Sequence, residues 1–216
     1  MKITKYPQSC ILIEDYKGKN ILFDPGTYVY EQSDITPDYW KNIDILLLTH
    51  KPGDHTDPEA IKVIIENNNP IILTNDEVQA YLKENGIESE VITEKEIENI
   101  KIKAITSLHG DLSKFGKETP KNTAFLIDDK ILHLGDTMTI DEKPYADIIL
   151  IPISDVAAMD AKKAAEFVNE VKPKLAIPIH YSNPNLPGQP EDFVKAMEGS
   201  DIKYKILENK ESIEVE

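Results

Sequence analysis

The feature of this sequence that most constrains its fold is the repeated change between short apolar runs and segments with helical spacing. Short apolar runs bounded by turn residues are typical of strands, whereas apolar residues three or four positions apart are typical of helices. The first third of the chain predicts mainly strands, at residues 10–13, 20–24 and 43–49. Lys17-Gly18-Lys19 predicts a hairpin turn between the first two of these strands.

Helices alternate with strands in the rest of the chain. Residues 56–58 supply a cap and a first-turn proline for one helix, and residues 75–76 can begin a second helix that Gly86 ends. Further strands are predicted at residues 70–74, 90–93, 100–107, 122–127, 130–134, 148–153, 174–179 and 202–207, with Asp128-Asp129 as a tight turn. Further helices are predicted after Asp160 and at residues 191–197.

Two runs of strands, each with helices on the outside, indicate an α/β fold. Because the apolar face of a sheet must be buried against another layer, two sheets can pack face to face and be covered by helices. We therefore predict an αββα sandwich of two mixed β-sheets flanked by helices. A length of 216 residues suits one compact domain, and we predict a single domain over residues 1–216.

The charge of the chain narrows its partners. The 24 basic residues are all lysine, and 39 acidic residues bring the net charge to −15. A field of that sign repels phosphate backbones and anionic lipids, so we expect a small-molecule substrate and neither nucleic acid nor membrane as a partner. The apolar runs at residues 45–48 and 148–153 are too short for a membrane helix, and the polar opening at residues 1–8 is no secretory signal. We expect a cytoplasmic protein.

The single cysteine, Cys10, limits the chemistry of any metal site. One cysteine excludes internal disulfides and clusters of zinc-binding thiolates. Cys10 lies in the apolar run at residues 10–13, so we expect a buried structural thiol. A metal would therefore have histidine and carboxylate ligands.

The histidines indicate where such a site lies. Four of the five stand at the end of a predicted strand or in the turn after one: His50, His55, His109 and His180. Asp54 adjoins His55, and Asp136 follows another strand. Loops after strands commonly assemble sites on a rigid scaffold. Imidazoles combined with two carboxylates suit Zn, Fe or Mn better than Ca or Mg.

The segment Thr49-His50-Lys51-Pro52-Gly53-Asp54-His55 resembles T-H-x-H-x-D-H, the signature of the metallo-β-lactamase superfamily. Later pieces follow in the family's order: Ser107-Leu108-His109-Gly110, Leu134-Gly135-Asp136-Thr137 and Pro178-Ile179-His180-Tyr181. Residues 9–14, 21–26 and 159–181 are similar to the branch that contains L-ascorbate 6-phosphate lactonase. The resemblance spans almost the whole chain.

This resemblance implies one or two divalent ions, Zn or Mn, with Fe as a further option. The first ion would be held by His50, His109 and Asp136, and the second by Asp54, His55, Asp136 and His180, so that Asp136 bridges both. Pro52 stands where the family has a third histidine for the first ion, and it has no lone pair to offer. We therefore predict unequal occupancy, with the second site filled first.

The resemblance also implies hydrolysis of a small-molecule ester, lactone, amide or phosphoester. A bound metal lowers the pKa of water toward neutrality and polarises a carbonyl or phosphoryl oxygen. Asp54 and Asp136 would be the catalytic carboxylates. The alternative, which Pro52 would explain, is a metal-binding, non-catalytic member that serves as a binding or sensory protein. Relatives in this branch often assemble, which leaves a homo-oligomer open.

Other residues near the motifs have two interpretations. Gln8 stands where the branch has histidine, which puts substrate contacts at that position in question. Tyr181 could donate a hydrogen bond to substrate or belong to the core. We expect His133 to be a packed or surface residue rather than a ligand, and Asp24-Pro25-Gly26 to be a turn rather than a site. The lysines of residues 111–121, a predicted mobile flap, could meet an anionic substrate or be solvated.

Overall fold

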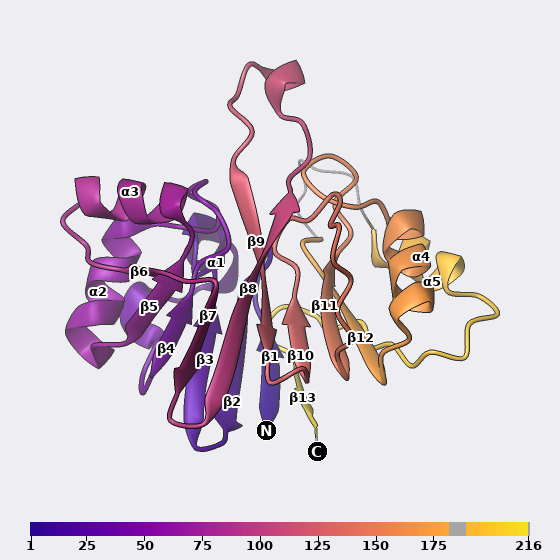
Figure 1. The fold of residues 1–216 in the computed structure, drawn as a ribbon, viewed down its shortest axis with the longest axis horizontal. Helices are drawn as coiled ribbons and strands as arrows, with labels where there is room; N and C mark the ends of the chain where they lie inside the picture. The colour runs from indigo at the N-terminus through magenta and orange to yellow at the C-terminus, as the bar shows by residue number, and fades with distance from the viewer. Residues whose placement is uncertain (182–188, 216) are drawn as a thin grey trace. The chain divides into compact units, whose positions relative to one another are not determined.

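The computed structural model describes residues 1–181 and 189–215 and divides into two compact units. The first unit comprises Met1–Ile92 with Leu207–Glu216, and the second comprises Thr93–Ile206. Each unit has its own sheet and its own helices (Figure 1). Both sheets contain parallel and antiparallel pairs, so the predicted α/β class with two mixed sheets is confirmed.

The first unit is built on a seven-stranded sheet in the order β13-β1-β2-β3-β4-β5-β6. Its strands are β1 (Lys2–Lys5), β2 (Ile11–Tyr16), β3 (Lys19–Phe23), β4 (Ile45–Leu47), β5 (Ile71–Thr74), β6 (Glu90–Val91) and β13 (Ser212–Glu214). The pairs from β13 to β3 are antiparallel, and those from β3 to β6 are parallel. Because β3, β4 and β5 run in one direction, the residues that follow them lie at one edge of the sheet, where such sheets bind ligands.

Helices α1 (Thr27–Ser33), α2 (Pro58–Asn68) and α3 (Asp76–Glu84) and the 3-10 turn η1 (Pro37–Tyr39) complete this unit. The side chain of Asp57 caps α2 and that of Asn75 caps α3, each accepting from backbone N–H groups of the first turn. The helices and strands share one apolar cluster: Tyr6, Cys10, Leu22, Val29, Trp40, Ile43, Leu46, Leu48, Ile61, Ile64, Ile72, Val78, Leu82 and Ile87. This packing fixes the strand ends from which the candidate ligands project.

The second unit has a six-stranded sheet in the order β12-β11-β10-β9-β8-β7. Its strands are β7 (Glu94–Ile97), β8 (Ile100–Leu108), β9 (Lys121–Ile127), β10 (Ile131–His133), β11 (Ile148–Pro152) and β12 (Leu175–Ile179). Strands β8 and β10 are both antiparallel to β9, and β10, β11 and β12 are parallel. Therefore β8, β10 and β12 run in the same direction and end at the same edge.

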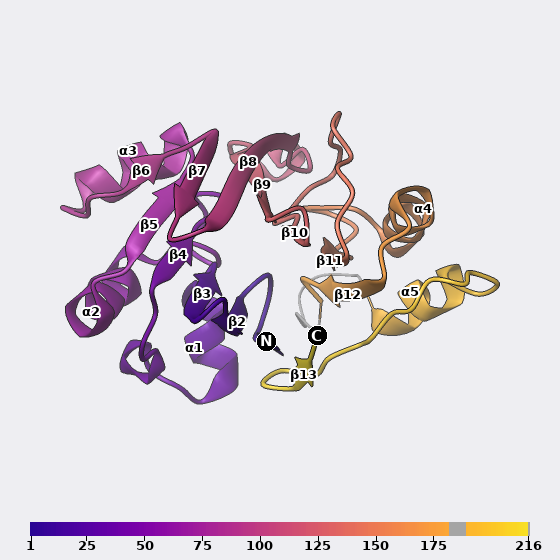
Figure 2. The same cartoon turned by 60° about the horizontal axis from the view of Figure 1, so that its bottom comes forward.

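Two helices cover one face of this second sheet (Figure 2). They are α4 (Ala161–Val171), which the side chain of Asp160 caps as expected, and α5 (Pro190–Ala196). The loop between β8 and β9 carries the 3-10 turn η2 (Ser113–Phe115) and extends past the ends of these strands (Figure 1). Most residues of this loop are exposed, as expected for the predicted flap.

Both predicted hairpin turns are confirmed. Lys17 and Gly18 connect β2 to β3 with φ values of 52° and 78°. Asp128 and Asp129 follow β9 and both have φ of 51°. Positive φ at both central residues gives a turn whose twist matches that of the antiparallel pair it connects. Local turn chemistry therefore sets these two strand registers.

The predicted closing strand at residues 202–207 is wrong. Among the described residues of this segment, Tyr204 forms a single bridge to Ala176 of β12. Ile202, Tyr204 and Ile206 pack against the apolar cluster of the second unit, so their alternation reflects packing rather than a strand ladder. The last strand is β13, which pairs with β1. Strands β1, β7 and β13 and helix α1 were not predicted from the sequence.

Candidate metal centre

The loop between β4 and α2 carries the candidate ligands of the first unit. His50 and His55 are buried, and their ring centroids lie 3.9 Å apart with the planes tilted by 44°. The side chain of Asp54 keeps 30% of its surface exposed, and its Oδ2 lies 3.6 Å from Nε2 of His55. The structure thus brings His50, Asp54 and His55 together, as the sequence motif predicts.

Asp24, directly after β3, fixes the orientation of both histidines. Its buried carboxylate accepts hydrogen bonds from the backbone N–H of Thr49 at 2.8 Å and from Thr49 Oγ1 at 2.6 Å. Its Oδ2 also lies 3.2 Å from Nδ1 of His55, and Thr49 Oγ1 lies 2.8 Å from Nδ1 of His50. Asp24 therefore holds one ring directly and the other through Thr49, and both contacts occupy Nδ1.

A close backbone approach holds this loop in place. A Cβ atom on Gly26 would lie 2.0 Å from the backbone carbon and oxygen of Asp54, so glycine is required there. The carbonyl oxygen of Pro52 accepts from the N–H groups of His55 and Thr56, both at 2.8 Å. Pro52 cannot ligate a metal, but its carbonyl supports the turn that carries His55.

The candidate ligands of the second unit follow three strands of its sheet. His109 comes after β8, Asp136 after β10 and His180 after β12, and all three are buried. Oδ2 of Asp136 lies 2.9 Å from Nε2 of His180 and 3.7 Å from Nε2 of His109. Nδ1 of His109 lies 2.8 Å from the carbonyl oxygen of Gly110 and donates to it. The carboxylate of Asp136 is thus the common partner of both imidazoles.

Asn122, on β9, holds the turn that carries Asp136. Its buried side-chain amide donates to Ser107 Oγ at 2.7 Å, to the carbonyl oxygen of Leu134 at 3.0 Å and to Thr137 Oγ1 at 3.1 Å. Its Oδ1 accepts from the backbone N–H of Asp136 at 3.1 Å. Because Ser107 lies two residues before His109 on β8, this network connects the strand that bears His109 to the turn that bears Asp136.

The remaining predicted residues lie where the structure gives them local partners. Gln8 is buried and its Nε2 donates to Asp54 Oδ2 at 3.4 Å. Tyr181 is 2% exposed and belongs to the apolar cluster of the second unit. His133 is buried on β10, and its Nδ1 accepts from the N–H of Gly135. Cys10 is a buried thiol, as expected, and burial raises its pKa well above the ordinary value.

The donor sets of both units fit a divalent metal ion. Three of the imidazoles have Nδ1 engaged by a neighbour: His50 by Thr49, His55 by Asp24, and His109 by the carbonyl of Gly110. Metal-binding imidazoles are commonly oriented by such a contact at the nitrogen that does not bind the metal. Two ligands of one tetrahedral zinc lie roughly 3.4 Å apart. The distances of 3.6 Å from His55 to Asp54 and 3.7 Å from His109 to Asp136 are close to that value.

Sequence reasoning missed two residues of this arrangement, Asp24 and Asn122. Residues 24–26 do form a turn, in which Gly26 N–H donates to the Asp24 carbonyl, but the interpretation as a turn alone is incomplete. The available signal was a carboxylate at the end of a predicted strand, similar to the signal that indicated Asp136. Asn122 opens a predicted strand, and no local signal marks its role.

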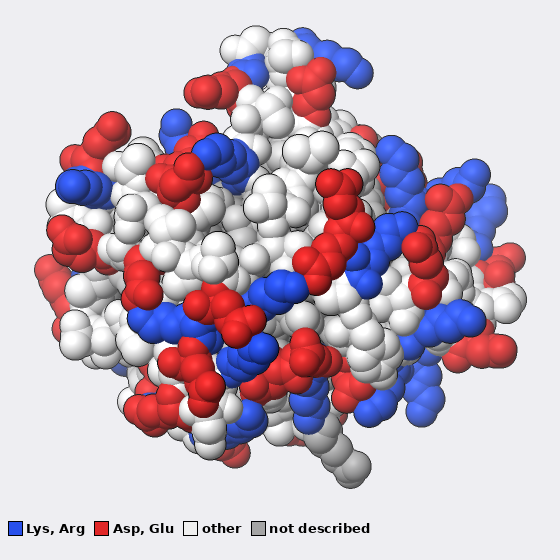
Figure 3. Space-filling view, in the orientation of Figure 1, with Lys and Arg blue, Asp and Glu red and all other residues white. Residues whose placement is uncertain are grey.

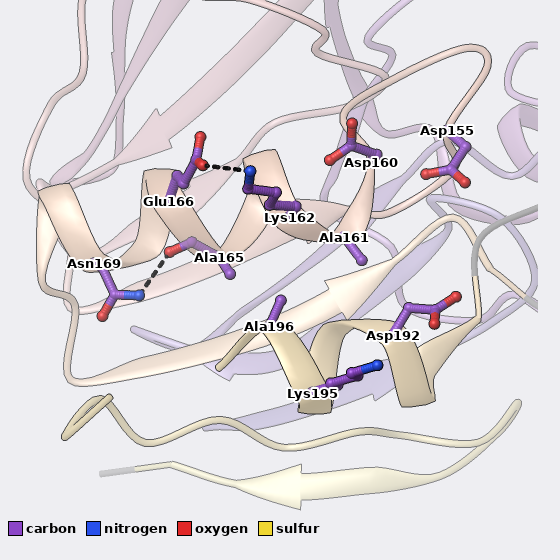
Figure 4. A pocket seen from close by; sticks show the side chains of 10 residues that line it. All are labelled: Asp155, Asp160, Ala161, Lys162, Ala165, Glu166, Asn169, Asp192, Lys195 and Ala196. Atoms are coloured by element: carbon purple, nitrogen blue, oxygen red, sulfur yellow. Dashed lines mark hydrogen bonds and ion pairs between the residues drawn. The ribbon is translucent and has the colours of Figure 1, made fainter. Parts of the chain in front are cut away.

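A separate pocket lies between α4 and α5 in the second unit, with a volume of about 590 Å³ (Figure 4). Asp155, Asp160 and Asp192 stand at one end of it, and the predicted metal ligands are not among its lining residues. On the face drawn in Figure 3, lysine and acidic side chains are intermixed. Within the described part of the chain, no helix is both long and apolar enough to cross a membrane.

Comparison with known proteins identifies the family. Residues 2–180 match the profile of the family described as a beta-lactamase superfamily domain. A UPF0173 metal-dependent hydrolase of Thermoplasma acidophilum is 33% identical over 201 residues, which cover 88% of each chain. A second UPF0173 metal-dependent hydrolase, from Methanosarcina barkeri, is 31% identical over 232 residues, covering 100% of this chain and 99% of the relative.

Solved structures agree on the fold. The crystal structure of a protein assigned as a metal-dependent hydrolase from Parabacteroides distasonis superposes with a TM-score of 0.77 at 23% identity, covering 94% of this chain and 91% of that one. The expectation of a metal-dependent hydrolase of the metallo-β-lactamase superfamily is thereby confirmed at the level of the family. The chain belongs to the beta-lactamase superfamily and, within it, to the UPF0173 metal-dependent hydrolases.

Proposed function

We propose that this chain hydrolyses a small-molecule ester, lactone, amide or phosphoester at a metal centre held by His50, Asp54, His55, His109, Asp136 and His180. The observation that carries the proposal is the orientation of the imidazoles. Three of the four have Nδ1 engaged by a neighbour in their own unit, and Nε2 of three of them lies within 3.7 Å of a carboxylate. Such pairs of nitrogen and carboxylate donors are what a divalent ion requires.

We assign these residues to two ions, as the resemblance to the metallo-β-lactamase superfamily implies. His50, His109 and Asp136 would hold the first, and Asp54, His55, Asp136 and His180 the second. Pro52 leaves the first ion with fewer protein ligands, so we expect the second site to fill first. Because the family profile runs through both compact units, we propose that residues 1–216 act as one domain.

When bound, a divalent ion acidifies water and polarises the oxygen of the scissile group. The protein's own contribution is to orient the carboxylates and exclude bulk water. Asp54 is suited to accept a proton from the attacking water because its side chain is partly exposed, whereas Asp136 is buried between two imidazoles. Asp54 and Asp136 are therefore the carboxylates to which we assign catalytic roles, and Tyr181 is kept as a candidate hydrogen-bond donor to substrate.

The charge of the chain favours a neutral substrate. Phosphate groups are usually gripped by Arg forks or clustered cations, and this chain has no Arg. The lysine of the ligand loop, Lys51, makes a cation–π contact with Tyr81 on α3, in which its Nζ lies 5.9 Å from the ring centroid. The similarity to the L-ascorbate 6-phosphate lactonase branch favours a lactone of a sugar acid, and we place a neutral lactone before its phosphorylated counterpart. The net charge of −15 also disfavours nucleic acid and membrane as partners. We expect the protein to act in the cytoplasm.

The test is a hydrolysis panel on Zn- and Mn-loaded protein, with lactones, esters, amides and phosphodiesters. Asp136→Ala is expected to lose turnover by a factor of about 100 or more, since its carboxylate is shared by two imidazoles. Asp141→Ala, which changes an exposed carboxylate in the same unit, is the matched control. Turnover that survives chelators would remove the proposal. Metal binding without turnover on any member would favour the non-catalytic alternative that Pro52 suggests.

A further inference from the structure

The backbone of Gln8 is held in a conformation that ordinarily favours glycine. Gln8 has φ of 59° in the tight turn between β1 and β2. In this turn the N–H of Tyr6 donates to the carbonyl of Cys10 at 2.9 Å, and the N–H of Cys10 donates to the carbonyl of Pro7 at 3.3 Å. A left-handed conformation carries a steric cost for a residue with a Cβ atom, so its presence needs an explanation.

Other left-handed residues of this chain provide that explanation. Most of the left-handed residues other than glycine are exposed, such as Asp15 near the end of β2 and Lys17 in the turn after it. Three buried residues other than glycine share the conformation in the described part of the chain, namely Gln8, Asp24 and His180. Asp24 orients the histidines of the first unit, and His180 is a candidate ligand. Strain that persists at buried polar residues is a feature of functional sites.

The side chain of Gln8 points at the candidate ligands of its own unit. Gln8 is 2% exposed, and its Nε2 donates to Oδ2 of Asp54 at 3.4 Å. The same oxygen lies 3.6 Å from Nε2 of His55. The amide therefore holds the carboxylate oxygen that faces the histidine. A neutral amide can do this without adding a competing charge.

We propose that Gln8 is a positioning residue that fixes the Asp54 carboxylate for metal binding, and that its left-handed backbone is retained because only that conformation aims the amide at Asp54. This inference rests on the proposed function, since it takes Asp54 as a metal ligand. It assigns a role to a residue at which this chain departs from the histidine of the related branch. Without the amide, the carboxylate would rotate more freely and bind the ion less tightly.

The experiment measures Zn²⁺ and Co²⁺ affinity by competition with a chromophoric chelator, and the melting temperature of the metal-free protein. Gln8→Met keeps the size of the side chain but removes its donor, and Gln8→Gly also removes the strain. Both are expected to weaken the ion that depends on Asp54 about tenfold or more. Gln8→His supplies a ring N–H donor in its place and is expected to retain most of the affinity.

Lys17→Met is the matched control, because Lys17 has the same left-handed conformation on an exposed turn. It is expected to leave metal affinity unchanged. Wild-type affinity in both Gln8→Met and Gln8→Gly would overturn the inference, as would affinity losses that merely follow the melting temperature across all variants. Asp54→Ala separates the two claims. If it weakens metal binding but the Gln8 variants do not, the inference on Gln8 fails alone; if it has no effect, the ligand role of Asp54 fails with it.

Discussion

A single buried carboxylate organises two histidines of the first unit. Asp24 accepts two hydrogen bonds from Thr49 and lies 3.2 Å from Nδ1 of His55, while Thr49 reaches Nδ1 of His50. Partners of this kind set the tautomer and direction of a metal-binding imidazole. Asp24 thus orients the rings of His50 and His55 and does not need to be a metal ligand itself.

Asp24→Asn tests this role. The carboxylate of Asp24 faces three donors, namely the N–H and Oγ1 of Thr49 and Nδ1 of His55. An amide would turn its own N–H₂ donor toward at least one of them, and that contact becomes repulsive. We expect Zn²⁺ affinity to fall about 10- to 100-fold and the free energy of unfolding to fall by about 1–3 kcal/mol. Both are measured on purified protein, by chelator competition and by denaturant titration.

Asp44→Asn is the control for this substitution. Asp44 lies before β4, away from the ligand loop, and accepts from the backbone N–H of Asn20 at 2.9 Å and from Lys19 Nζ at 3.3 Å. It should lose stability but keep its Zn²⁺ affinity. Equal losses of affinity in the two variants would mean that Asp24 acts only on the fold.

At the residue scale, the sequence predicted ligand types but not their supporting partners. His50, Asp54 and His55 share one short motif, and His109 and His180 each stand at the end of a predicted strand, so residue type and strand position were enough to select them. The role of Asp24 depends on Thr49 and His55, which are 25 and 31 positions away. The role of Asn122 depends on Ser107 and Asp136, 15 and 14 positions away. Such contacts follow from the fold and have no local signature.

At the scale of elements, Gly26 sets how closely the turn after β3 approaches the ligand loop. A Cβ atom there would meet the backbone of Asp54 at 2.0 Å. We expect Gly26→Ala to displace the loop, to lower the free energy of unfolding by about 1–3 kcal/mol and to weaken metal binding. Gly53→Ala changes a glycine in the same loop whose added Cβ would come no nearer than 4.0 Å to Thr27 Cγ2. Unfolding and metal titrations that rank the two variants equally would contradict this assignment.

A buried lysine connects β1 to the segment before β13. Lys5 donates to Asn209 Oδ1 at 2.9 Å and to the carbonyl of Tyr6 at 3.3 Å. Burial lowers its pKa to about 8 from 10.5, although the charges of Glu208 and Cys10 oppose the shift. Below pH 8 the lysine is protonated in both states. Between pH 8 and 10.5 the lysine is deprotonated in the folded state but still protonated in the unfolded state. The free energy of unfolding should therefore rise with pH over this range.

Lys5→Met should remove this rise. Denaturant titrations of the metal-free protein between pH 7 and 10.5 measure it, and we expect a steeper dependence in the wild type than in the variant. Lys210→Met, which changes an exposed lysine of the same C-terminal segment, should keep the wild-type dependence. An unchanged slope in Lys5→Met would show that other groups titrate in this range.

Elements were predictable where the signal is local. Helix caps at Asp57, Asn75 and Asp160 and the turns at Lys17 and Asp128 depend on neighbouring residues, and all are present. Strand β13 could not be recognised in this way, because its partner β1 lies at the other end of the chain. Residues 202–207 alternate like a strand because their apolar side chains face a core, and periodicity alone does not separate the two cases.

At the scale of the whole molecule, the order of motifs carried more information than any single segment. The α/β class with two mixed sheets was predicted from the alternation of strand-like and helix-like segments, the superfamily was predicted from motifs that run from residue 9 to residue 181, and both are confirmed. The finer branch, the substrate and the sharing of ligands between two ions stay predictions. Each compact unit supplies half of the predicted ligands, so neither unit alone contains the complete set.

The central claim is that these ligands bind two ions of unequal affinity, and metal content per chain tests it most directly. Elemental analysis and titration with Zn²⁺ on protein first stripped of metal should show one tight ion and a second that is about tenfold or more weaker, because Pro52 replaces a ligand of the first site. Asp136→Ala should lose both ions. Two equally tight ions would contradict the predicted role of Pro52, and wild-type binding in Asp136→Ala would contradict the metal centre itself.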